Sequence, residues 1–186
     1  MKRIVVLGVL LICFSGCSGK EPELEQGLAL RAKLLNGDSF SFDADITADY
    51  GDKLHIFSME CTSDNTGSLD FTVTAPQSVS GITGNIDAEG GRLTFDDLVL
   101  HFELLTDEQL SPVSAPWIFV RTLRSGYIVS ASREDGKICM TIQDRYDENA
   151  LVLDIRLDDQ ELPERAQILC DGRRILTMDV KNVVIR

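Results

Sequence analysis

The chain has 186 residues, with 18 lysines and arginines against 30 aspartates and glutamates, a formal net charge of −12, and 44% apolar residues. This composition is typical of one globular domain and excludes a largely disordered chain or a repeat array. Because phosphates repel an acidic protein, the charge also argues against nucleic-acid binding.

The first seventeen residues have the pattern of an export signal. A basic pair at positions 2 and 3 precedes an apolar run at 4–14, which is shorter than the roughly 20 residues that a helix needs to cross a bilayer. Ser15, Gly16 and Cys17 follow and resemble the bacterial lipobox, although Phe14 stands where that family usually has an aliphatic residue. The resemblance implies cleavage before Cys17 and a diacylglycerol on its thiol.

This resemblance sets the domain boundaries. We expect a lipoprotein signal peptide at 1–16, a short lipidated tether at 17–22 and a single domain at 23–186, held on the outer face of the cell membrane through Cys17. Anionic headgroups would repel so acidic a domain, so the anchor would have to be covalent. The alternative is an ordinary signal peptide with a chance cysteine.

The next segment has a helical period. Leucines recur at spacings of three, four and seven residues between positions 22 and 35, Pro22 suits the first turn, and Gly37 suits the position after the end. The residues of this apolar pattern are Leu24, Leu28, Leu30, Leu34 and Leu35. We therefore predict one amphipathic helix.

From position 40 the period changes to two. Between Phe40 and Tyr50 every even position is apolar and every odd position is polar, which predicts a strand with one dry and one wet face. Further short strands are predicted at 54–61, 69–74, 80–86, 92–95 and 98–102, separated by Gly and Asp turns.

A second helix interrupts the strands. It is predicted at 117–124, with Ser114 as its N-cap, Gly126 beyond its end, and an apolar face that must lie on a sheet. Strands then resume at 127–132, 137–143, 151–156, 166–170 and 175–180.

The element order predicts the fold class. It is mainly β (α+β): a curved antiparallel open half-barrel of about ten to eleven strands, with an N-terminal helix and an inserted lid helix. Because each strand has one wet face, we expect the polar side of the sheet to face outward and both helices to cover the apolar side.

These patterns resemble the LolA/LppX-like superfamily of bacterial lipid carriers and surface lipoproteins. The resemblance covers residues 23–186 and includes the run 67–76; the runs 48–51, 80–84, 93–97 and 111–117 are similar to uncharacterised LolA-like lipoproteins of clostridia and their relatives. It implies a half-barrel whose concave face holds acyl chains, and it carries no catalytic fingerprint.

Signals for chemistry are weak. His55 and His101 are far apart in sequence, so neither a metal site nor a cofactor is predicted. Cys61, Cys139 and Cys170 remain after export; they are either buried thiols or include one disulfide, with Cys61 and Cys170 the favoured pair. The carboxylates Asp43, Asp45, Asp49, Asp96 and Asp97 fit a solvated face better than an acid–base pair.

The apolar residues of the strands and of the second helix remain as candidates to line a ligand site. They are either a filled core or the walls of a lipid-sized pocket beneath the lid. The leading hypothesis is a membrane-anchored, non-enzymatic binder of a lipid or other amphiphile; the alternatives are a filled-core module that contacts another envelope protein and, more remotely, an anchored hydrolase. The candidates are Phe40, Phe42, Ile46, Tyr50, Phe57, Met59, Leu69, Phe71, Val73, Trp117, Phe119, Val120 and Leu123.

Overall fold

The computed structural model describes residues 22–96, 98–102, 105–106 and 109–186. The predicted signal peptide, the predicted tether up to residue 21 and Cys17 lie outside these residues. None of the helices in the described part of the chain is long and apolar enough to cross a membrane.

The fold is one open antiparallel sheet of 11 strands with two helices, α1 (Pro22–Asn36) and α2 (Ala115–Ser125). The strand order is β6-β5-β4-β3-β2-β1-β13-β12-β11-β10-β9, and β7 and β8 form a separate pair. This confirms the predicted fold class and both helices. The strands are β1 (Ser39–Asp49), β2 (Leu54–Asp64), β3 (Leu69–Ala75), β4 (Thr83–Ile86), β5 (Gly91–Phe95), β6 (Leu98–Phe102), β7 (Leu105–Thr106), β8 (Gln109–Leu110), β9 (Tyr127–Glu134), β10 (Lys137–Gln143), β11 (Val152–Leu157), β12 (Pro163–Cys170) and β13 (Arg173–Ile185).

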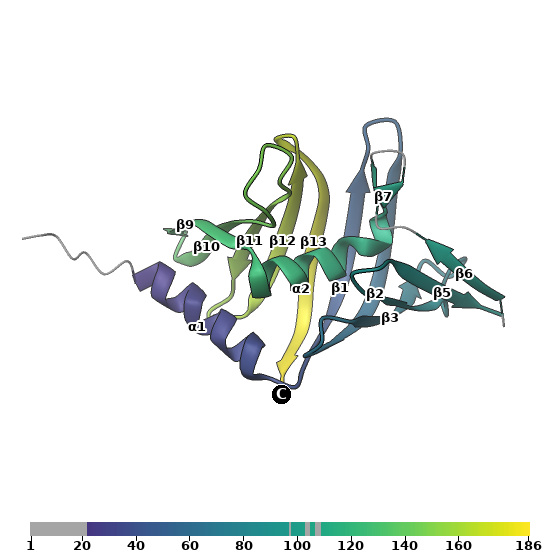
Figure 1. Ribbon diagram of the computed structural model, residues 1–186, viewed down its shortest axis with the longest axis horizontal. Coiled ribbons are helices and arrows are strands. Elements are labelled where there is room, and N and C mark those ends of the chain that lie inside the picture. The colour runs from purple at the N-terminus through teal and green to yellow at the C-terminus, as the bar shows by residue number, and fades with distance from the viewer. Residues whose placement is uncertain (1–21, 97, 103–104, 107–108) are drawn as a thin grey trace, which may run out of the picture.

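Two meanders meet in the middle of the sheet. Strands β1 to β6 run outward in one direction and β13 back to β9 in the other, and β1 pairs with β13 from Phe40 opposite Ile185 to Ala48 opposite Leu176. The first and last strands are therefore central neighbours (Figure 1). The chain between β6 and β9, which includes α2, crosses from one free edge of the sheet to the other.

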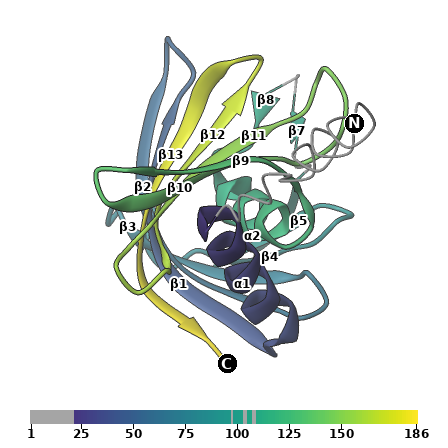
Figure 2. The same cartoon turned by 90° about the vertical axis from the view of Figure 1, so that its left-hand side faces the viewer.

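The period-two pattern of β1 sets the inside and the outside of the half-barrel. Every even residue from Phe40 to Ala48 is buried, whereas Asp43 and Asp45 lie on the opposite face. The sheet curves, and α1 and α2 lie within its concave side (Figure 2). The apolar face that the sequence predicts is therefore the concave one.

Two Asp-Gly pairs form tight turns between neighbouring strands. Asp135 and Gly136 have φ angles of 49° and 82° and link β9 to β10, and Asp171 and Gly172 have φ angles of 51° and 71° and link β12 to β13. Positive φ at both central residues is the geometry that matches the twist of a hairpin, and Asp-Gly adopts it readily.

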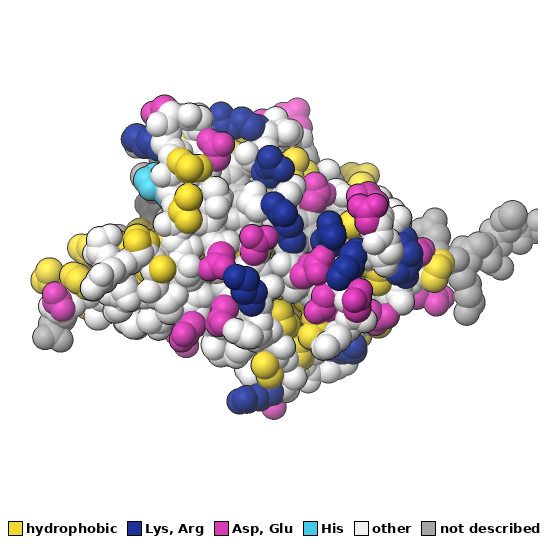
Figure 3. Space-filling model, turned by 180° about the vertical axis from the view of Figure 1, so that it is seen from behind, with side chains coloured by type: hydrophobic (Ala, Val, Ile, Leu, Met, Phe, Trp, Pro, Cys, Tyr) yellow, Lys and Arg dark blue, Asp and Glu magenta, His cyan; other side chains and the backbone are white. Residues whose placement is uncertain are grey.

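The convex face carries charges of both signs (Figure 3). Lys181 binds Asp45 across the central seam, and Arg156 Nε lies 2.8 Å from Glu164 Oε1 in the second meander. Because these side chains are half-exposed, each pair adds little stability. The charged exterior keeps the sheet soluble.

Three local details differ from the predictions. Helix α1 buries Leu30 and Leu34 around Gly27, while Leu28 and Leu35 face solvent, because a helix with one contact face uses only part of its leucine pattern. At the start of α2, Ser114 donates its hydroxyl to Ser111 O at 2.6 Å and does not cap the helix with its side chain. Strand β4 begins at Thr83, not at residue 80, because a turn precedes it.

Candidate functional site

Helix α2 is packed directly against the sheet. The ring centroids of Phe40 and Phe42 are 5.0 Å apart, and the Phe119 ring from α2 lies 6.2 Å from the first and 5.5 Å from the second. These separations are within the range of favourable aromatic contacts. Side chains therefore fill the space between this part of the helix and the sheet.

Hydrogen bonds hold both faces of α2 in place. Trp117 Nε1 donates to Gly67 O at 3.0 Å in the β2–β3 turn, and Arg124 Nη1 donates to Ser63 Oγ at 3.2 Å. From the other side, Arg31 of α1 donates through Nε to Leu123 O at 2.8 Å, where it meets the carbonyl end of α2. Partial burial lowers the pKa of both arginines.

The predicted ligand-lining residues therefore separate into two groups. Eleven of them are buried in one core cluster, and Tyr50 and Phe57 are half-buried at its margin. The buried eleven are Phe40, Phe42, Ile46, Met59, Leu69, Phe71, Val73, Trp117, Phe119, Val120 and Leu123.

An apolar groove opens at the margin of this core. Its volume is about 430 Å³, within the range of small-molecule sites, and all of its lining residues except His55 are apolar. The β1–β2 hairpin end, the turn after β3, strand β5 and the short 3₁₀ helix Pro112–Ser114 contribute to it. Its lining residues are Leu54, His55, Ile56, Phe57, Val73, Pro76, Val79, Ile82, Leu93, Pro112 and Val113.

We call these eleven residues the groove. Of the predicted lining residues it contains Phe57 and Val73. Sequence reasoning missed the others: Ile56 and Leu93 lie within strands, whereas most of the rest lie in turns or at the ends of elements, where no period indicates a face. The apolar residues Val79 and Ile82 beside Gly81, within a turn-rich segment, are the one signal that could have been noticed.

A hydrogen bond fixes one wall of the groove. Tyr50 donates its hydroxyl to Leu110 O, and its ring lies 6.2 Å from the ring of His55. Burial raises the pKa of Tyr50, so this phenol stays protonated and remains a donor at neutral pH. The wall next to His55 is thereby tied to the residues that precede α2.

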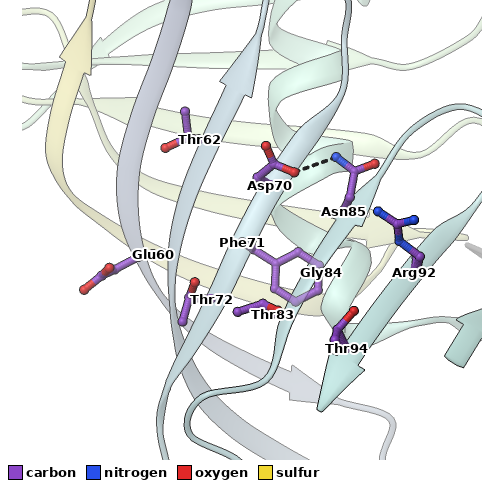
Figure 4. A pocket seen from close by; sticks show the side chains of 10 residues that line it. All are labelled: Glu60, Thr62, Asp70, Phe71, Thr72, Thr83, Gly84, Asn85, Arg92 and Thr94. Atoms are coloured by element: carbon purple, nitrogen blue, oxygen red, sulfur yellow. Dashed lines mark hydrogen bonds between the residues drawn. The ribbon is translucent and has the colours of Figure 1, made fainter. Parts of the chain in front are cut away.

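Two other hollows are polar. One, of about 410 Å³, lies on the convex side of β2 to β5, where Asn85 Nδ2 donates to Asp70 Oδ1 at 2.7 Å (Figure 4). The other, of about 550 Å³, adjoins α2, where the Arg121 guanidinium lies 5.1 Å from the centre of the Trp117 ring. Both mix carboxylates with arginines and hydroxyl or amide groups, so neither presents one sign of charge to a ligand.

Three of the five carboxylates that the sequence singles out have structural partners, and Asp97 lies outside the described residues. Asp43 Oδ2 accepts from Asn182 at 2.6 Å, and Asp49 Oδ1 accepts from Gly51 N at 2.8 Å. Hydrogen bonds from Lys181 and Ser58 lower the pKa of Asp45. Within the described residues no group of three His, Cys, Asp or Glu side chains could hold a metal ion.

The suggested disulfide between Cys61 and Cys170 is not formed. Both residues carry free thiols, as does Cys139. Cys61 of β2 pairs with Phe42 of β1, which lies opposite the C-terminal end of β13. Cys170 of β12 pairs with Arg173 at the start of β13. About ten residues at roughly 3.3 Å each separate these levels, far beyond the roughly 7 Å that a disulfide allows between Cα atoms. Burial raises the pKa of Cys61 strongly.

Comparison with known proteins finds similarity at the level of structure. No protein-family profile and no curated protein sequence matches the chain. An uncharacterised conserved protein from Thermus thermophilus aligns over 88% of each chain with 9% identity and a TM-score of 0.48. A LolA superfamily protein from Nitrosomonas europaea aligns over 86% of this chain and 93% of its own, with 11% identity and a TM-score of 0.46.

The lipoprotein LppX from Mycobacterium tuberculosis is also similar. It aligns over 88% of this chain and 96% of its own, with 14% identity and a TM-score of 0.42. At these identities the similarity is one of chain arrangement alone.

Proposed function

We propose that this protein is an exported, membrane-anchored lipoprotein that binds the apolar part of a lipid or other amphiphile in the groove, without catalysis. The groove carries the proposal. It is the hollow with the most apolar lining among those described above, and its volume suits part of an acyl chain.

Burial of apolar surface would supply the affinity. Each Å² of apolar ligand surface that leaves water contributes about 25 cal/mol, and six of the lining residues are already packed in or against the core. His55 is the one lining side chain that can form a hydrogen bond to a ligand headgroup, so selectivity among amphiphiles would rest mainly on shape. The Cys17 lipid would hold the groove near its source of ligand.

A photoactivatable palmitate analogue tests the proposal in cells that make the full chain. After irradiation, label should appear on peptides that contain groove residues, in addition to any acyl group on Cys17. Ile82→Asp should reduce groove labelling by about tenfold or more, because an unpaired carboxylate in apolar surroundings costs at least about 1.4 kcal/mol.

Val184→Asp provides the matched control. Val184 is another exposed apolar residue, it lies on β13 outside the groove, and its substitution should leave the labelling unchanged. Equal labelling of both variants, or label confined to Cys17, would contradict the proposal.

The packed core favours one alternative function. If the concave face is filled and the groove binds nothing, the domain would act as a surface module that contacts another envelope protein. In that case no groove residue is labelled, while export and acylation of Cys17 remain. Loss of export and of Cys17 acylation would contradict the lipoprotein assignment as well.

A further inference from the structure

Strand β6 is a free edge of the 11-stranded sheet. It pairs with β5 on one side, and in the described part of the chain no strand lies on its other side. Its sequence, Leu98-Val99-Leu100-His101-Phe102, contains no Asp, Glu, Lys or Arg. Natural sheets usually protect such an edge with charges, prolines or a covering element, because unpaired N–H and C=O groups are a template for another strand.

Apolar side chains are exposed on both faces of this edge. Leu98 and Leu100 are 68% and 64% exposed, and they are in register with Phe95 and Leu93 on the concave side. Val99 is 52% exposed on the convex side. A role as a groove wall would explain exposed apolar residues on the concave face alone. A strand that pairs with β6 would contact side chains on both faces of the sheet.

The other free edge is protected. Strand β9 also exposes Val129, at 58%, but it ends in Arg133 and Glu134. Arg133 Nε lies 3.3 Å from Glu23 Oε1 of α1, and its Nη2 donates to Gln26 at 3.1 Å. Charges and a neighbouring helix therefore cover β9 in the way that natural edges are covered, whereas Leu98–Phe102 of β6 contain no Asp, Glu, Lys or Arg, although Asp97 precedes and Glu103 follows them in the sequence.

We propose that β6 pairs antiparallel with β6 of a second copy of this chain, about a two-fold axis at Leu100. This proposal does not depend on the proposed function. In this register Leu98 lies opposite Phe102 of the other copy, Val99 opposite His101, and Leu100 opposite itself. Every pair within Leu98–Phe102 joins residues of the same face, and no Asp, Glu, Lys or Arg lies among these five residues.

The distribution of charge favours a second copy at this edge. Two chains of net charge −12 repel each other, so they can associate only where the contact itself is uncharged. Strand β6 lies at one end of the long axis, away from α1 and most of the molecule (Figure 1), and apolar side chains gather at this end (Figure 3). End-to-end pairing therefore keeps the acidic bulk of the two copies apart.

Pairing would also change the concave face. Leu100 is next to the groove residue Leu93 in the sheet, so the two-fold axis would place two grooves side by side on one continuous sheet. The exposed leucines would then be covered by their counterparts in the other copy.

Cysteine cross-linking of the full chain in cells tests the proposal. With Leu100→Cys, the two introduced thiols lie directly opposite each other, at a Cα separation that a disulfide allows, so mild oxidation should give a covalent dimer on a non-reducing gel. Val129→Cys is the matched control at the other edge and should give no more dimer than the parent chain, which carries the same native cysteines.

Two further experiments test the register and the energetics. Co-expressed chains with Leu98→Cys and Phe102→Cys should cross-link to each other, and each should cross-link less with itself. Leu100→Lys, which brings two ammonium groups together, should weaken self-association at least tenfold by analytical ultracentrifugation, while Val129→Lys should not. A Leu100→Cys chain that stays monomeric, or that cross-links only to a different protein, would overturn the proposal.

Discussion

At the scale of single residues, most polar side chains near the core serve the position of α2. Arg31 and Arg124 donate hydrogen bonds to backbone carbonyls, and Arg124 also donates to a serine. Three of their other nitrogens, Arg31 Nη2 and Arg124 Nε and Nη2, are buried without a hydrogen-bond partner. Both cations are therefore only partly satisfied. Both side chains are only partly buried, and their bonded N–H groups satisfy carbonyls, Arg31 that of Leu123 at the end of α2 and Arg124 that of Asp64 at the end of β2.

The buried thiol of Cys61 predicts how stability depends on pH. Because burial raises its pKa in the folded state, the unfolded chain loses this proton first once the pH passes about 8.5, and stability is then lost as the pH rises further. The free energy of unfolding should fall between about pH 8.5 and 10, and Cys61→Ala should make this fall shallower. Urea unfolding at several pH values measures both slopes.

Cys170→Ala is the control for this prediction. Its thiol is less buried than Cys61, although burial raises its pKa as well, so the slope should change less. Cys61→Ala will also lower stability at every pH because it removes a buried sulfur, and only the slope tests the titration. An unchanged alkaline slope in Cys61→Ala would contradict the prediction.

At the scale of elements, the junctions decide how closely helices approach the sheet. Gly126 ends α2, and a Cβ there would lie 2.7 Å from the carbonyl oxygens of Thr122 and Gln143. Gly27, in α1, would place its Cβ 2.1 Å from Met140 Sδ. The neighbours of Gly126 are backbone atoms, which cannot move without displacing α2 or β10. The neighbour of Gly27 is the flexible end of the Met140 side chain.

This difference predicts opposite sensitivities to the same substitution. Gly126→Ala should lower the free energy of unfolding by about 1–3 kcal/mol, as overpacking does, because the φ of −71° is ordinary and the cost is steric. Gly27→Ala should change it by no more than about 1 kcal/mol, since the gain in helix propensity offsets the shift of Met140. Urea unfolding of both variants measures this; a larger loss at Gly27 would contradict it.

At the scale of the whole molecule, an excess of negative charge surrounds a core that spans both meanders. Ion pairs such as Lys137 with Glu164, at 3.1 Å, which joins β10 to β12 across β11 on the convex face, are few against a net charge of −12. Long-range repulsion between carboxylates therefore outweighs the attraction within exposed pairs.

Salt should consequently stabilise the fold. Raising sodium chloride from about 10 mM to about 0.3 M shortens the Debye length from about 30 Å to about 6 Å and screens the repulsion. The midpoint of thermal unfolding should rise by about 2–4 °C, equivalent to about 1 kcal/mol for a domain of this size. An uncharged osmolyte at matched osmolarity is the control, and a fall of the midpoint with salt would show that the ion pairs dominate.

The sequence alone determined the local structure. The change from a helical period to a period of two places α1 and β1 within about one residue of their observed ends, and Asp-Gly pairs fix two hairpins, because these patterns depend on neighbouring residues. The even residues of β1 are likewise buried as predicted, since alternation assigns one face of a strand whatever the partner strands are.

Only the tertiary structure decided which of these faces are covered. Alternation marks both Phe42 and Leu100 as facing inward, but the first lies under Phe119 and the second is exposed at a free edge. The order of the strands, the central pairing of β1 with β13 and the separation of Cys61 from Cys170 are long-range contacts that no local period encodes. The position of the groove also depends on tertiary structure, because the groove forms only where distant segments meet beside the start of α2.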